Sequence, residues 1–280
     1  MVRPAGASGL GSILLHVDAG AASAVRLDVA RALAARHGGC VTALFGAVAD
    51  DDPGYAYSAG AALDSAGARA WREAVVGHLQ RAAKQPALAS ERWFHVAGDS
   101  VAHGFVAEAP YADLLVLGQQ APGERLPGGA PAGFVETVIL EGGRPALVVP
   151  ADAPGAAIGR RALVAWNGSV PAARALAGAL VLLRAAESVH VATWSRHPAA
   201  APFSGLGILE HLRRHGVEAT LHHRGATAQV GEELAALAAA LGCDLVVMGG
   251  YGHSRARERL LGGTTRSWLQ RMPVPVLMAH

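Results

Sequence analysis

Glycines near the end of the chain have a spacing that could bind the phosphates of a ligand. Gly249, Gly252 and Gly262 follow the pattern G-x-x-G, then nine residues, then G. A glycine has no Cβ, so its backbone N–H can approach an anion closely or adopt φ > 0. Thr264 and Thr265 come shortly after, and a helix that began there would direct its N-terminus at the same anion. The residue types therefore indicate anion binding, provided that a strand and a helix flank the loop.

The flanking segments have the character that such a site needs. Residues 244–248, DLVVM, are a short run that predicts a strand buried in a parallel sheet. The sequence GGTTRSWLQRM that follows predicts a helix, capped by Thr264 or Thr265, with Trp268 and Leu269 packed inward. In a chain with 35 glycines the spacing could also serve only to turn a loop. The position between a buried strand and a helix makes the pattern more specific.

Length and composition predict two globular domains with no nucleic-acid partner. A chain of 280 residues exceeds one ordinary domain. Half of the residues, 51%, are apolar and 16% are charged, which is enough for a sizeable core. The 24 basic and 22 acidic residues nearly balance, so no charge field favours nucleic acid.

The order of predicted elements repeats once along the chain. We expect strands at 12–17, 41–48, 93–97, 113–118 and 146–149, and again at 161–166, 189–194, 217–222, 244–248 and 276–279. We expect helices at 21–36, 63–84, 101–108, 134–140, 170–185, 203–215, 230–241 and 264–271. YADLLVLG at 111–118 returns as GCDLVVMG at 242–249, and RPALVV at 144–149 corresponds to VPVLMA at 274–279. The chain is therefore predicted to be one domain duplicated.

Alternating strands and helices predict right-handed crossovers and a parallel sheet in each half. We therefore expect an α/β fold of two doubly wound, five-stranded, Rossmann-like domains. The first domain would span residues 1–150 and the second 160–280. Residues 151–159, ADAPGAAIG, are small and contain proline, so they predict a linker.

The glycine pattern resembles the carboxy-terminal nucleotide loop of the universal stress protein family. Gly249, Gly252 and Gly262 match it residue by residue, and the resemblance extends over both halves. It implies a tandem universal stress protein that responds to stress, with strand order 3-2-1-4-5 in each half. It also implies ATP, accompanied by Mg²⁺, as the ligand. The two halves would pair through their fifth strands, and a further homodimer could form.

Three loops at the carboxyl ends of the strands supply the predicted nucleotide site, because ligands of open α/β sheets bind there. The predicted residues all lie in the second half and are Asn167, Thr193, Gly249, Gly252, Gly262, Gly263, Thr264 and Thr265. Two of them depart from the family: Gly263 replaces a Ser or Thr, and Asn167 replaces an Asp. In the first half Asp18 keeps the acid, but Ala121 stands where Gly252 stands. We therefore expect ATP in the second half alone.

Other interpretations of these residues stay open. Asn167 or Ser169 could simply cap a helix. The protein could act through protein contacts without a nucleotide, or hydrolyse ATP slowly. We predict no catalytic residues, because Glu258 lies among three arginines that would pair with it rather than leave it to orient water.

The remaining reactive residue types predict structural roles. His222 and His223, with His211 and His215 at helical spacing, form the densest histidine group, yet Arg213 and Arg214 between them indicate a solvated surface and no metal site. Cys40 and Cys243 stand at the start of apolar strands and predict buried thiols. No run is long enough to span a membrane and the start lacks a leader, so we expect a cytoplasmic protein.

Overall fold

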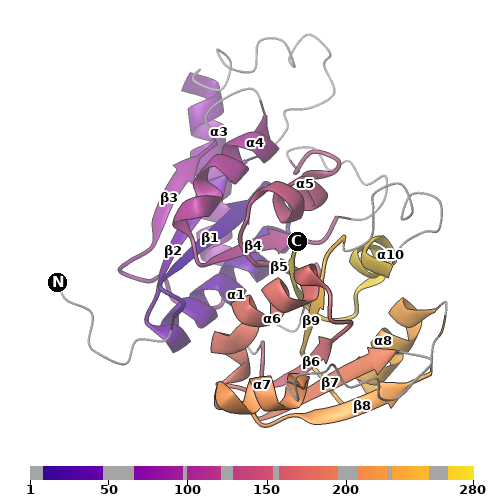
Figure 1. Ribbon diagram of the computed structural model, residues 1–280. Coiled ribbons are helices and arrows are strands. Elements are labelled where there is room, and N and C mark those ends of the chain that lie inside the picture. The colour runs from indigo at the N-terminus through magenta and orange to yellow at the C-terminus, as the bar shows by residue number, and fades with distance from the viewer. Residues whose placement is uncertain are drawn as a thin grey trace. The chain divides into compact units, whose positions relative to one another are not determined.

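The computed structural model divides into two compact units, Met1–Ala156 and Ala157–His280. It describes residues 9–46, 66–96, 100–120, 129–153, 158–194, 207–225, 227, 229–251 and 264–280. Each unit has parallel strands with helices between them (Figure 1). The expected α/β class is therefore confirmed.

The first unit contains five strands. They are β1 (Ser12–Val17), β2 (Cys40–Phe45), β3 (Arg92–His95), β4 (Leu114–Gly118) and β5 (Ala146–Val149). The helices are α1 (Ala22–His37), α3 (Ala66–Ala82), α4 (Val101–Glu108), the short 3-10 helix η1 (Ala109–Tyr111) and α5 (Phe134–Glu141). The strand order is β3-β2-β1-β4-β5, with every pair parallel. This is the predicted order 3-2-1-4-5.

The second unit repeats that plan. Its strands are β6 (Arg161–Ala165), β7 (Ser188–Trp194), β8 (Thr220–Arg224), β9 (Leu245–Gly249) and β10 (Val276–Ala279). Its helices are α6 (Val170–Leu183), α7 (Ile208–Arg214), α8 (Val230–Ala240) and α10 (Thr264–Arg271). The strands lie in the order β8-β7-β6-β9-β10 and are again parallel. In both units the order reverses between the first and fourth strands.

The central strands are buried because helices cover both faces of each sheet. All five residues of β4, and the first four of β9, are buried. Such strands carry continuous Leu and Val runs rather than an alternating pattern. In the first unit α1 packs near α3, and α4 packs near α5. Right-handed crossovers place these two pairs on opposite faces of the sheet.

Helix ends explain where the predicted boundaries fail. After α7, Gly216 has φ +74°, its N–H bonds Arg213 O, and Val217 N bonds Leu212 O. These two bonds form a Schellman motif, which includes Val217, a residue that we had assigned to a strand. The strand predicted at 217–222 therefore begins only at Thr220 and continues to Arg224.

An aspartate of each repeated segment makes the same kind of contact in both units. Asp113 accepts hydrogen bonds from the N–H groups of Gly11 and Ser12, at 2.7 and 2.9 Å. Asp244, its counterpart, accepts from the N–H groups of residues 159, 160 and 161 at 3.0 to 3.1 Å. In each unit the carboxylate at the start of the fourth strand therefore holds the start of the first.

One buried ion pair joins distant parts of the first unit. The Arg31 guanidinium on α1 donates twice to Glu91, at 2.7 and 2.9 Å, and both side chains are almost wholly buried. Burial alone would raise the pKa of Glu91, but hydrogen bonds from Arg31 and Trp93 keep that pKa below its ordinary value. The pair fixes the start of β3 against α1.

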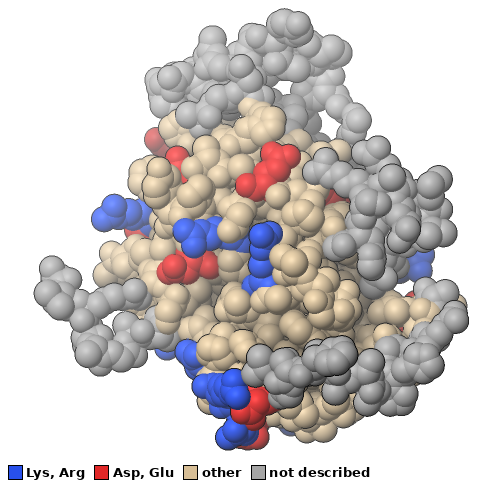
Figure 2. All heavy atoms as spheres, in the orientation of Figure 1, with Lys and Arg blue, Asp and Glu red and all other residues tan. Residues whose placement is uncertain are grey.

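On the face drawn in Figure 2, basic and acidic side chains are interspersed. The described part of the chain contains no helix long and apolar enough to cross a membrane.

Ile158 and Gly159, which we placed in the linker, pack within the second unit: Ile158 is buried and Gly159 N binds Asp244. The pairing of the halves through their fifth strands stays a prediction.

Candidate functional site

The carboxyl ends of three neighbouring strands form the candidate site of the second unit. Ala165 on β6 is the register partner of Met248 on β9 and of Ala192 on β7. Because the strands are parallel, the residues that end or follow them lie at one edge of the sheet. Asn167, Thr193 and Gly249 are thus brought to the point where the strand order reverses. Ligands of open α/β sheets bind at such a point.

Gly249 has a structural reason to be glycine. A Cβ there would lie 2.6 Å from Ala172 N and 2.9 Å from Pro171 C, both in the first turn of α6. No real Cβ tolerates such contacts with backbone atoms. The glycine therefore allows the N-terminus of α6 to lie against the end of β9.

Asn167 and Ser169 prepare the start of α6. Ser169 caps the helix, because its Oγ accepts from Ala172 N at 3.3 Å. Asn167 Oδ1 accepts from Ser169 N at 3.1 Å, which forms an Asx turn. The capping role that we left open is thus present. Asn167 is exposed, and its Nδ2 makes no hydrogen bond to described residues, so a donor remains for a ligand.

The loop between β9 and α10 is held where it leaves the strand. Tyr251 has φ +56°, a conformation uncommon outside glycine, and its N–H donates to Thr265 Oγ1 at 3.3 Å. Thr265 is buried on α10, and Thr264 is the first residue of that helix. Gly252, Gly262 and Gly263 lie outside the described residues. The two ends of the predicted anion loop, a strand end and a helix start, are therefore joined by a hydrogen bond.

Thr193 contacts the neighbouring strand β8. Its Oγ1 lies 3.2 Å from His223 Nδ1 on β8. The next residue, Trp194, donates its indole N–H to Glu233 on α8 at 2.8 Å. At the end of β7, the Thr193 side chain thus contacts a side chain of β8, and the Trp194 side chain contacts a side chain of α8.

Two residues near the loop were missed by sequence reasoning. His280 Nδ1 lies 3.2 Å from Gly250 O, and Arg174 Nη1 donates to His280 O at 2.7 Å. Arg174 therefore places a cation close to the start of the loop. No motif marked either residue, because 106 residues separate them in sequence.

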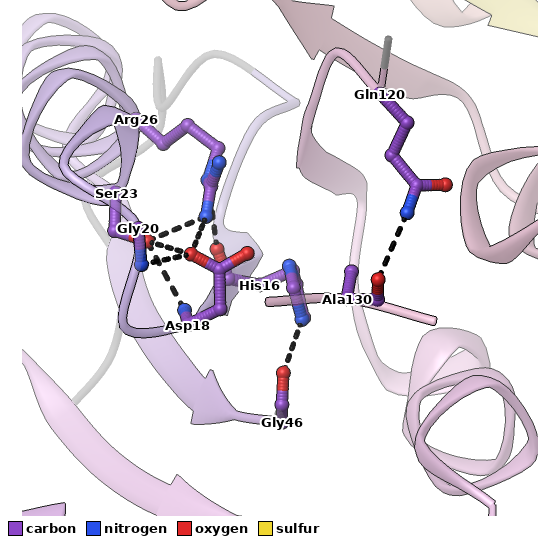
Figure 3. A network of polar contacts seen from close by, with 8 residues as sticks. All are labelled: His16, Asp18, Gly20, Ser23, Arg26, Gly46, Gln120 and Ala130. Carbon is purple, nitrogen blue, oxygen red and sulfur yellow. Dashed lines mark hydrogen bonds and ion pairs between the residues drawn. The ribbon is translucent and has the colours of Figure 1, made fainter. Parts of the chain in front are cut away.

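The corresponding edge of the first unit holds a polar network and a small hollow (Figure 3). Asp18 Oδ1 accepts from Gly20 N at 3.0 Å, from Ser23 Oγ at 2.7 Å and from Arg26 Nη2 at 2.9 Å. The hollow beside it measures about 80 Å³ and is lined in part by Asp18, Arg26 and Gln120. At about 30 Å³ per water it holds two or three waters.

Arg26 fills the space over the first glycine of the degenerate loop. A Cβ at Gly118 would collide with Arg26 Nη1 and lie 2.9 Å from Arg26 Cζ. Counting from Asp18 and Asn167, the residue in the place of Arg26 is Ala175, a small buried residue of α6. The described residues of the two units therefore differ at their strand ends: Arg26 is a buried guanidinium in the first, whereas Arg174 near the corresponding edge of the second is exposed.

The network controls the charges of its members. Burial alone would raise the pKa of Asp18, but Arg26 and the hydrogen bonds from Ser23 and Gly20 hold that pKa below its ordinary value. Burial, and then the charge of Arg26, lower the pKa of His16 to about 4. His16 is therefore neutral at pH 7, and its Nε2–H donates to Gly46 O at 2.8 Å. Asp18 and Arg26 remain an ion pair.

Gln120 completes the far wall of the hollow. Its Nε2 donates to Ala130 O at 3.1 Å and to Pro131 O at 2.8 Å. Two carbonyl partners fix the orientation of the amide. Its Oε1 is buried and has no hydrogen-bond partner among the described residues, so it can accept from a water in the hollow.

The cysteines take no part in either site. Cys40 and Cys243 are free thiols, and Cys40 Sγ lies 3.2 Å from Gly11 O. Burial raises the pKa of Cys243 to about 11, so its thiol is protonated and unreactive at pH 7. Cys243 is buried as predicted, whereas Cys40 is only partly buried.

The sequence model of the universal stress protein family matches residues 159–280. Residues 159–280 belong to the universal stress protein family. The match covers the whole second unit from Gly159 on, including the loop between β9 and α10. The comparison with curated proteins yields no match.

Solved structures extend the likeness in fold to the whole chain. A universal stress protein from Archaeoglobus fulgidus has a TM-score of 0.67 at 17% identity, and the alignment covers 96% of this chain and 95% of that one. A functionally unknown protein from Pseudomonas aeruginosa has a TM-score of 0.56 at 15% identity, with 96% and 92% covered. At these identities the likeness shows the fold. Both units therefore share the fold of tandem universal stress proteins.

Proposed function

We propose that the second unit binds ATP at the carboxyl ends of β6, β7 and β9 and holds it without efficient turnover. One observation carries the proposal. The glycine pattern runs from the last residue of β9, Gly249, to the start of α10 at Thr264, next to the point where the strand order reverses. A loop in that position, leading into a helix N-terminus, suits an anion.

The residues present fit a nucleotide at its two ends. The free amide N–H group of Asn167 and the neighbouring Thr193 would face the nucleoside. The glycine amides, Thr264 and the N-terminus of α10 would face the phosphates, and Mg²⁺ would accompany them by neutralising phosphate charge. Arg174, held by His280 O, adds a cation near the start of the loop.

The decisive experiment is a calorimetric titration with ATP of the wild type and of Gly252→Val. A β-branched side chain should obstruct the approach of phosphate to the backbone, and we expect affinity to fall by about tenfold or more. Gly225→Val is the matched control, since a Cβ at Gly225 meets nothing within 4 Å. The control should bind as wild type does. Equal affinity of Gly252→Val and wild type would show that the loop assignment is wrong.

Holding without turnover follows from what phosphoryl transfer requires. Catalysis needs a positioned water and charge stabilisation of the transition state, and we identified no residue set for it. Glu258, the acid of the loop, lies outside the described residues. A steady-state phosphate-release assay with Mg²⁺ should detect no sustained turnover. Multiple turnovers that vanish in Glu258→Gln, with ATP binding intact, would assign catalysis to this loop.

A second candidate function is action through protein contacts without a nucleotide. Specific observations favour it: Gly249, Asn167 and Thr265 each have a structural task that needs no ligand. Analysis of a denatured extract of the purified protein separates the candidates. Adenine nucleotide at near one equivalent supports the first, and its absence together with no ATP binding in calorimetry supports the second.

We place this function in the cytoplasm. The two thiols, Cys40 and Cys243, are both free, which fits a reducing compartment. Fractionation of cells that produce the protein tests this placement.

A further inference from the structure

Two histidines that are distant in sequence meet at the edge of the second sheet. His190 lies on β7 and His222 on β8, and their Nδ1 and Nε2 atoms are 3.1 Å apart. The ring centroids are 5.1 Å apart and the ring planes are inclined by 55°. The parallel register, with His190 opposite Thr220 and His222 opposite Ala192, fixes both backbones. The pair is thus prearranged by the sheet.

The distance between these nitrogens suits a shared metal ion. Imidazole nitrogens bind divalent transition metals at about 2.0–2.1 Å. Two such bonds at angles from a right angle to the tetrahedral value separate the nitrogens by roughly 2.9 to 3.4 Å. The observed 3.1 Å lies within that interval. Both rings are part-buried, so each keeps a path to solvent through which an ion can enter.

We propose that His190 and His222 chelate a divalent transition-metal ion, Cu²⁺ in preference to Zn²⁺. The preference follows from nitrogen ligands and the general order of affinities. The remaining coordination positions are open to water or to a small anion. Among the described residues no group of three or more His, Cys, Asp or Glu side chains is placed to hold a metal, so the site has two protein ligands.

Binding needs no net loss of protons from the pair. In the metal-free contact one of the two facing nitrogens carries a hydrogen and the other accepts it. When the ion binds, Nδ1 of His190 and Nε2 of His222 give their lone pairs to the metal. The hydrogen then resides on the distal nitrogen of its ring, so both imidazoles stay neutral and donate outward.

The other histidine pair of this unit is less suited to a cation. His211 and His215 on α7 have ring centroids 4.7 Å apart. Arg184 Nη2 already donates to His215 Nδ1 at 3.2 Å, and Arg213 and Arg214 lie on the same helix. These positive charges oppose an incoming ion.

Near the proposed site, Arg224 is the basic residue of β8 on the same sheet face as His222, by strand alternation, and it is exposed.

The ion would connect β7 to β8, the edge strand of this unit. An ion that binds only the folded state stabilises it by mass action. We therefore expect Cu²⁺ to raise the thermal midpoint and to slow amide hydrogen exchange in β8. Neither effect should depend on ATP, because the imidazole pair lies outside the proposed nucleotide loop.

The test is a titration of the full chain with Cu²⁺ and Zn²⁺, measured by calorimetry and by electron paramagnetic resonance of the first Cu²⁺ equivalent. The variants are His190→Ala and His222→Ala. The matched control is His223→Ala, a neighbouring histidine on β8 that contacts Thr193 instead. His211→Ala controls for the other pair.

We expect affinity for the first Cu²⁺ to fall by about tenfold or more in His190→Ala and His222→Ala, because one of two ligands is lost. The controls should bind as wild type does, and the resonance spectrum should show two coordinated nitrogens. Circular dichroism establishes that each variant is folded. Unchanged affinity in either pair variant, or an equal loss in His223→Ala or His211→Ala, overturns the proposal.

Discussion

In the first unit, the Arg26 side chain can reach its position only because residue 118 is a glycine. The guanidinium lies where a Cβ of residue 118 would be, with Cζ only 2.9 Å from that position. Arg26 thereby reaches Asp18 and Ser23 from α1 while covering the end of β4. Gly118, which stands where Gly249 stands in the second unit, thus leaves space for an internal cation. In the second unit the corresponding Gly249 supports the start of α6 instead.

The pairing of Arg26 with Asp18 predicts a large loss of stability in Arg26→Met. Removing one partner leaves a buried carboxylate without its counter-ion, which costs about 3 to 5 kcal/mol. Ser23 and the Gly20 amide still bind Asp18, so we expect the lower end of that interval. Urea unfolding of the first unit measures the effect.

Arg26→Met combined with Asp18→Asn is the informative control. Neutralising the carboxylate removes the uncompensated charge, so the double variant should be more stable than Arg26→Met alone. If the double variant loses the sum of the two single losses, Asp18 and Arg26 are not energetically coupled. The ion pair would then contribute nothing specific to this edge of the sheet.

The buried ring of His16 predicts a pH-dependent stability. Its pKa is lowered from 6.5 to about 4, so between these values the unfolded state binds the proton more readily. Stability contributed by the neutral ring is complete above pH 6.5 and is lost as the pH falls toward 4. Over the full interval the loss amounts to about 3 kcal/mol.

The comparison that isolates His16 uses His16→Leu, which fills the space beside Phe134 without a titrating group. Unfolding free energies are measured in urea between pH 7.5 and pH 4.5. The wild type should lose more stability than the variant over this range, since other histidines contribute equally to both. Parallel curves would mean that the ring is protonated in the folded state without cost.

The fold could be predicted from the sequence because its signals are local and repeated. The runs at β4 and β9 are continuously apolar, and the segments that contain them keep the same Asp, Leu, Val and Gly positions in both halves. Helix ends were less predictable: the bond from Val217 N to Leu212 O displaced the start of β8. Gly216, with φ +74°, is the residue type that could have marked this helix end in the sequence. Boundaries depend on hydrogen bonds that form only once the helix exists.

The sites were less predictable because their decisive contacts join distant residues. The sequence marked Asp18 as a retained acid but gave no sign that Arg26, on the helix α1 that follows, would neutralise it. It grouped His222 with His211 and His215, whereas the structure pairs it with His190 on the neighbouring strand. Strand register, which a single sequence specifies weakly, brings such residues together.

The repeated aspartate of the fourth strands predicts equivalent roles in both units. Asp244→Ala removes the acceptor of three backbone N–H groups, and we expect a loss of about 2 kcal/mol. Asp113→Ala removes two such bonds and should cost less. Asp152→Ala is the control, since Asp152 is exposed. Chemical unfolding of the three variants would contradict this account if Asp152→Ala lost as much as Asp244→Ala.

The substitution Gly249→Ala tests whether position 249 is a glycine for a structural reason or for ligand binding. In Gly249→Ala the new Cβ meets backbone atoms Ala172 N and Pro171 C, so β9 or α6 must shift. Such overpacking costs about 1 to 3 kcal/mol. Gly207→Ala is the control, because a Cβ there meets nothing within 4 Å. We therefore expect Gly249→Ala to unfold at lower urea concentration than Gly207→Ala and wild type.

An ATP titration of the same variants measures the effect of each substitution on nucleotide affinity. The clash is with the helix that Ser169 and Asn167 cap, so a shift of α6 should weaken any nucleotide held beside Asn167 as well. Reduced stability together with reduced affinity is the expected outcome for Gly249→Ala. If stability stays at the wild-type value while ATP binding is lost, Gly249 serves the ligand alone, and the close approach of β9 and α6 is not what requires a glycine there.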